Sequence, residues 1–151
     1  MYLENSKTVV IKIGSSLLIN EKKIIRKKWL SEFAKDIKHL KDENKNIILV
    51  SSGAIALGCK KLNLSKKNLK LDKSQAVASI GQIELMNLLN KIFSNKKINI
   101  SQILLTLEDT EQRRRAINAK RTFDNLFKLP LTFFLISSEN STLVVTIFFG
   151  F

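Results

Sequence analysis

The stretch VVIKIGSSLL, residues 9–18, places a single lysine, Lys12, inside an apolar run that breaks at Gly14. An ammonium group is costly to bury in a core unless it reaches an anion, and Lys12 stands close to the end of the run. Gly14 allows close backbone approach, and the successive amides around Gly14, Ser15 and Ser16 can hold phosphate oxygens. The spacing fits a phosphate site and, equally, an edge-strand lysine in solvent.

A second break, in VSSGAIALG at residues 50–58, repeats the order of strand, small polar residues, glycine and helix. Serine at its start can cap free amides. Amides at such a helix start favour a carboxylate or phosphate, although an ordinary capped helix is the simpler interpretation of this stretch alone. Two such loops at one edge of a sheet predict a site for two anions. Neither loop is a Walker A motif, because no G-x-x-x-x-G-K-[ST] occurs.

Short apolar runs and helical periodicity predict the elements that must position these loops. Strands are expected at 8–13, 46–50, 98–105 and 131–136, and helices at 22–43, 54–62, 73–95 and 108–127. This alternation predicts an α/β fold, a mostly parallel sheet with helices on both faces. Ligands of such sheets bind at the carboxyl ends of the strands, where both glycine-containing breaks fall.

Length and composition fit one domain: 151 residues with 44% hydrophobic content can build a sizeable core. The net charge of +13 indicates anionic partners: nucleic acid, a membrane surface or a phosphorylated small molecule. Cys59 is the single cysteine, so no internal disulfide forms, and no signal-peptide pattern precedes the first strand. We expect a cytoplasmic protein.

The segment 129–151 is apolar, and Glu139 is its only charged residue. The polar run at 137–142 divides it, so neither piece reaches the roughly 20 residues of a spanning helix. We therefore expect no membrane partner.

Other polar residues carry weaker signals. Arg113, Arg114 and Arg115 are successive on an expected helix and so spread over different faces, which favours a solvated helix with ion pairs to neighbouring acids. His39 fits a helix-end or surface role. Cys59 fits a small buried side chain, and Asn118 receives no role.

Five stretches together resemble the amino acid kinase family, and within it the branch that phosphorylates glutamate. They lie in collinear order over residues 8–130 and read VVIKIGSSLL, IILVSSGAIALG, QAVASIGQIELMNLL, ISQILLT and INAKRTFDNLF. The resemblance implies the three-layer sandwich of that family. It also implies ATP-dependent phosphorylation of the γ-carboxylate of L-glutamate, the first step of proline synthesis.

The resemblance also implies residue roles and partners. Lys12 matches a catalytic lysine, and Lys12, Gly14 and Ser15 match the side that binds the phosphates of ATP. Ser52, Gly53 and Ala54 match the loop that binds the amino acid. Mg²⁺ would bridge the nucleotide phosphates, with no metal ligand assigned to the chain, and the family implies a homo-oligomer.

The resemblance fails near the C-terminus. Where the family has Asn-Glu-Asn-Asp, residues 138–141 read Ser-Glu-Asn-Ser, and the nucleotide-binding half of the family has no counterpart before Phe151. We therefore expect residues 1–130 to form the N-terminal part of a truncated amino acid kinase domain and residues 131–151 a divergent tail. A reading frame shifted near Pro130 is one hypothesis for that tail.

Two functions remain open from sequence. One is the kinase, either active or as an inactive N-terminal fragment. The alternative is a basic α/β module that binds nucleic acid or another polyanion without catalysis. No RNP motif, zinc spacing or helix-turn-helix signature supports nucleic acid, so this alternative ranks second.

Overall fold

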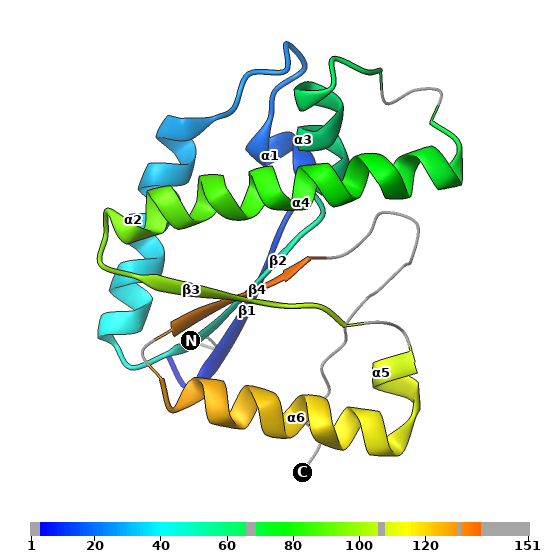
Figure 1. Cartoon of the computed structure of the whole chain (residues 1–151). Coiled ribbons are helices and arrows are strands. Elements are labelled where there is room, and N and C mark those ends of the chain that lie inside the picture. The colour runs from blue at the N-terminus through cyan, green and yellow to red at the C-terminus, as the bar shows by residue number, and fades with distance from the viewer. Residues whose placement is uncertain (1–3, 66–68, 106–107, 130, 137–151) are drawn as a thin grey trace.

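The computed structural model describes residues 4–65, 69–105, 108–129 and 131–136, which build a parallel sheet between two layers of helices (Figure 1). The sheet has the order β1-β2-β4-β3, and every neighbouring pair is parallel. Its strands are β1 (Thr8–Ile13), β2 (Asn46–Ser51), β3 (Asn99–Ile103) and β4 (Leu131–Ile136). The predicted α/β fold with a parallel sheet is confirmed.

Helices connect the strands and cover both faces of the sheet (Figure 1). They are α1 (Ser15–Leu18), α2 (Lys27–Asp42), α3 (Ala54–Lys61), α4 (Leu71–Ser94), α5 (Glu108–Glu111) and α6 (Arg113–Phe127). Helices α1 to α4 contribute to the larger core on one face, and α6 packs on the other face. Within the described residues, no helix is long and apolar enough to cross a membrane.

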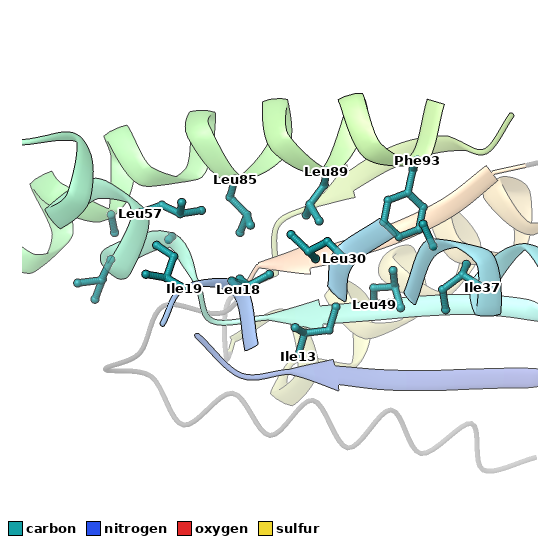
Figure 2. Packing of buried hydrophobic residues seen from close by; sticks show 14 of the residues in the cluster. Ile13, Leu18, Ile19, Leu30, Ile37, Leu49, Leu57, Leu85, Leu89 and Phe93 are labelled. Atoms are coloured by element: carbon teal, nitrogen blue, oxygen red, sulfur yellow. The ribbon is translucent and has the colours of Figure 1, made fainter. Parts of the chain in front are cut away.

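The larger core lies between α4 and the sheet. Leu85, Leu89 and Phe93 point from α4 toward buried side chains of α2 and β2, as Figure 2 shows. Each fully buried side chain of this size contributes roughly 1.5–3 kcal/mol relative to exposure. This core fixes α4 and α2 on the sheet.

Strand β2 is buried on both faces, as its continuous apolar run predicts. Ile47 and Leu49 belong to the larger core, whereas Ile48 packs with Phe123 of α6 in a smaller one. This double burial anchors β2 and the loop at its carboxyl end.

The predicted helix at 22–43 begins later than expected, at Lys27. Residues 19–25 instead form a tight turn, closed by an antiparallel bridge between Ile19 and Ile25. The Asn20 side-chain oxygen accepts a hydrogen bond from the Ile24 amide at 2.8 Å, and Lys23 has a positive φ of 57°. This local side-chain hydrogen bond replaces helical pairing at these positions.

The helical periodicity of 73–95 predicts a buried side that includes Val77, Leu85 and Leu89, and the structure confirms these three on α4. It also predicts burial of Ile80 and Ile83, which are exposed instead, Ile83 by 64%. Where α3 packs closely against α4, the buried side carries the small residues Ser74, Ala78 and Gly81.

The predicted helix at 108–127 is divided into α5 and α6, since Gln112 has an extended backbone (φ −83°, ψ 116°). Strand β4 begins the predicted tail of 131–151 and lies between β2 and β3. Residues 137–151, including the serine-containing stretch 138–141, lie outside the described residues.

Candidate active site

The two glycine-containing loops lie side by side because β1 and β2 pair in register. Lys12 is opposite Val50, and Ile13 is opposite Ser51. Both strands end at this point and run in the same direction, so the Gly14 loop and the Ser52 loop leave the same edge of the sheet. The structure thus brings together the two loops that the sequence predicts.

Lys12 is exposed, so its ammonium is not held in a core. Strand β1 is an edge strand among the described residues and turns Ile13 toward the larger core. Lys12 and Val10 lie on its opposite face, where Val10 is 48% exposed. This burial fits the edge-strand alternative. Within the described part of the chain, the Lys12 side chain makes no hydrogen bond or ion pair, and its charge faces solvent at the carboxyl end of β1.

Gly14 precedes the single turn of α1 with an extended backbone (φ −70°, ψ 153°). A Cβ at Gly14 would meet open space, its nearest neighbour being the Ser16 Oγ at 3.9 Å. The backbone therefore does not require glycine here, and the open space leaves room for a ligand to approach. Ser15, the first residue of α1, is half-buried.

An internal hydrogen bond fixes the Ser51–Gly53 loop. Ser51 is fully buried, and its Oγ accepts a hydrogen bond from the Gly53 amide at 3.4 Å. Gly53 caps α3 with no side-chain hydrogen bond, so the expected serine cap at the helix start is absent and Ser51 holds the turn before it. Ser52 is half-exposed between these two buried residues and is the side chain of the loop that a ligand can reach.

Two close contacts couple this loop to its neighbours. A Cβ on Gly53 would lie 2.1 Å from the Leu18 Cδ1, so Leu18 fills the space beside Gly53 and joins α1 to the loop. A Cβ on Gly81 would lie 1.7 Å from the Ala54 carbonyl oxygen. Buried Ala54, the third residue of the predicted amino-acid loop, thus contributes backbone to the packing of α3 on α4.

Ser51 was not singled out from the sequence, and its role can be tested. Ser51→Ala removes the acceptor of the Gly53 amide, so we expect a loss of about 1 kcal/mol in the free energy of unfolding. Urea denaturation of both chains measures this difference. Ser51→Thr, which keeps the hydroxyl but adds a methyl group in a buried place, separates the hydrogen bond from packing. An unchanged midpoint for Ser51→Ala would contradict the role.

The weaker candidates fall where the sequence suggests. His39 is exposed near the end of α2, with its Nε2 3.3 Å from a Glu43 carboxylate oxygen. Cys59 is buried on α3. Arg115 pairs with Asp109 at 3.7 Å, which confirms an ion pair to a neighbouring acid.

The end of β1 fits the phosphate side of the nucleotide that the resemblance implies. An exposed lysine and an open glycine at the end of β1 fit the phosphates of ATP. Among the described residues, no three His, Cys, Asp or Glu side chains gather as a metal site. Mg²⁺ in such sites is held largely by phosphates and water, so the fit concerns the phosphate side alone.

Two solved structures illustrate the likeness of this fold to known ones. Carbamate kinase from Giardia aligns with a TM-score of 0.54 and 12% identity, over 87% of this chain and 58% of the other. Isopentenyl phosphate kinase aligns with a TM-score of 0.55 and 10% identity, over 87% and 57%. At such identities the likeness concerns the fold alone.

The chain belongs to the amino acid kinase family, whose model matches residues 7–144. It is 72% identical over 146 residues to the glutamate 5-kinase of Pelagibacter ubique, covering 97% of this chain and 39% of the relative. It is 46% identical to the glutamate 5-kinase of Sinorhizobium fredii, covering 95% and 36%. The chain thus spans about two fifths of the length of the curated relatives that it matches.

Proposed function

We propose that this chain phosphorylates the γ-carboxylate of L-glutamate with ATP and forms glutamyl 5-phosphate, the first step of proline synthesis. The single observation that carries the proposal is the register of β1 and β2, which puts Lys12 and the Ser52 loop at one edge of the sheet. The high identity to proteins named glutamate 5-kinase supports the choice of glutamate.

The main difficulty of this reaction is bringing two anions together. When bound, ATP supplies the phosphoryl group that the glutamate carboxylate accepts. Lys12 lowers the repulsion between the two, because its ammonium lies exposed at the strand end that both loops share. Phosphoryl transfer depends mainly on such positioning and charge stabilisation, so no further covalent chemistry is required of the chain.

The Ser52 loop orients the amino acid in this proposal. Its backbone is fixed by the buried Ser51 hydrogen bond and by the contact of Gly53 with Leu18. The half-exposed Ser52 hydroxyl can then donate to a substrate carboxylate without reorganising the loop.

The proposal is tested by ADP release from the purified chain with ATP and Mg²⁺, with and without glutamate. We expect release that requires glutamate and persists as salt is raised. A folded chain that releases no ADP in response to glutamate would overturn the proposal. The polyanion-binding alternative predicts instead that an oligonucleotide binds with an affinity that falls steeply with salt and ignores glutamate.

Ser52→Ala tests the glutamate side separately. A hydrogen bond to a charged group is worth about 1.5–3 kcal/mol, so we expect the KM for glutamate to rise about tenfold or more. The KM for ATP should stay within about twofold, because Ser52 contacts only the amino acid in this proposal. The matched control is Ser79→Ala, because Ser79 is an exposed serine on α4. Equal changes in both KM values would contradict the assignment.

The remaining proposals concern organisation. We keep residues 1–130 as the N-terminal part of the kinase domain and 131–151 as a divergent tail. The family further suggests a homo-oligomer in the cytoplasm. Size measurement by light scattering tests the oligomer directly.

A further inference from the structure

Helix α6 carries a basic concavity that the proposed function does not use. Arg113, Arg114 and Arg121 line it together with Ile117 and Asn118, and its volume is about 530 Å³. Arg114, Ile117, Asn118 and Arg121 lie within one side of the helix because Arg114 is three, four and seven residues before the other three, and Arg113 is one turn before Ile117. From the sequence alone, Arg113 and Arg114 are expected on different faces of the helix. In the structure both line the concavity, together with Arg121 about two turns further along.

The charges of this cluster have no acidic partner among the described residues. Arg113, Arg114 and Arg121 are exposed, and within the described residues their guanidinium groups make no ion pair or hydrogen bond. Their neighbour Arg115 differs, since it pairs with Asp109. Helix α6 contains five basic residues and one acidic residue, so like charges repel along it. An anion held among the three arginines would relieve that repulsion.

The residue types indicate which anion. A guanidinium presents a planar fork of donors that matches two phosphate oxygens, and three of them surround this concavity. Residues 113 and 121 are separated by about 12 Å along the helix axis, from the rise of about 1.5 Å per residue. The long arginine side chains from both ends of this distance can converge on one ligand that carries several phosphate oxygens. Ile117 adds an apolar contact, and the volume lies in the range of small-molecule sites, roughly 300–1,000 Å³.

We propose that this face of α6 binds a small polyphosphorylated anion of about the size of a nucleoside di- or triphosphate. None of Lys12, Gly14, Ser15 or the Ser52 loop lines the concavity. The site is therefore separate in its residues from the candidate active site, and the proposal does not depend on the kinase reaction. A nucleic acid would need basic groups along a longer path than this one cluster provides.

The test uses inorganic triphosphate as the probe and calorimetric titration of the 151-residue chain. The Lys12→Ala chain serves as the parent, so that binding at the candidate active site does not add to the signal. Arg114→Gln with Arg121→Gln removes two of the three forks. Lys120→Gln with Lys128→Gln is the matched control, because it removes the same charge from the same part of the chain at residues outside the concavity.

We expect one binding site on the parent. The affinity of the double arginine variant should be weaker by at least about tenfold. The lysine control should change affinity no more than about threefold, through screened charge alone. Equal loss in both double variants, or absence of binding to the parent, would overturn the proposal. It would also be overturned if a single-stranded oligonucleotide displaced triphosphate at a lower concentration than ATP does. Circular dichroism checks that the exposed substitutions leave the fold unchanged.

Discussion

Lys12→Ala is expected to lower kcat for glutamate phosphorylation about 10²- to 10³-fold, the effect of removing one group that stabilises transition-state charge. Lys12 lies at the shared edge of the two loops, and its charge faces no acidic partner among the described residues. Its exposure means that alanine leaves the core untouched, so the melting temperature should hold while turnover falls. Steady-state kinetics at saturating glutamate and ATP measure the change.

Lys7→Ala provides the matched control for Lys12. Lys7 is also exposed and stands just before the opposite end of β1, so its removal changes net charge equally without altering the site. Turnover should remain within about twofold of the parent, because surface charges at this distance are screened. Similar losses in both variants would mean that overall charge, rather than Lys12 in particular, supports activity.

Gly81→Ala is expected to destabilise the fold by about 2–3 kcal/mol, the cost of overpacking. The added Cβ would lie 1.7 Å from the Ala54 carbonyl oxygen and 2.7 Å from the Gly58 amide nitrogen. Both are backbone atoms at the contact of α3 with α4, so no side-chain rotation relieves the clash. The helix-propensity gain of alanine, about 1 kcal/mol, is smaller than this cost. Because Ala54 follows directly after Gly53, the shift should also raise the KM for glutamate.

Gly14→Ala is the comparison that isolates the clash. It adds the same methyl group, but the nearest atom lies 3.9 Å away and φ is −70°, which alanine adopts readily. Denaturant unfolding should therefore place Gly14→Ala within about 0.5 kcal/mol of the parent. If Gly81→Ala were as stable as Gly14→Ala, this result would contradict the close packing of α3 on α4.

Local patterns predicted the strands well. The bounds of β1 and β4 match those expected, because each is a compact apolar run that ends at glycine or begins after proline. The parallel sheet followed from the alternation of strands and helices, and the adjacency of the two candidate loops followed from the sheet. The strand bounds depend on residues close together in the chain, and the sheet and the adjacency of the loops follow from the order of the elements.

The failures depend on partners distant in the chain. Ile80 and Ile83 were assigned to the core by periodicity, yet α3 approaches α4 too closely for large residues, and Gly81 lies in the contact instead. The sequence left open whether Lys12 reaches an anion or lies in solvent on an edge strand, and only the pairing of β1 with β2 alone in the described sheet shows that it is an exposed edge-strand residue. The buried position of Ser51 could have been predicted, because this polar residue directly continues the apolar run of β2. The arginine cluster on α6 could not be predicted from the sequence, because it depends on which residues share one side of that helix in the structure.

The central claim is that this chain activates the γ-carboxylate of glutamate as an acyl phosphate, and trapping that product tests it most directly. Hydroxylamine attacks an acyl phosphate at its carbonyl carbon and releases phosphate, so glutamyl 5-phosphate is converted to the γ-hydroxamate, which mass spectrometry identifies. With ATP, Mg²⁺ and glutamate, we predict hydroxamate from the parent chain and at least about tenfold less from Lys12→Ala. A folded parent chain that forms no hydroxamate, or forms as much as the Lys12→Ala chain, would contradict the claim.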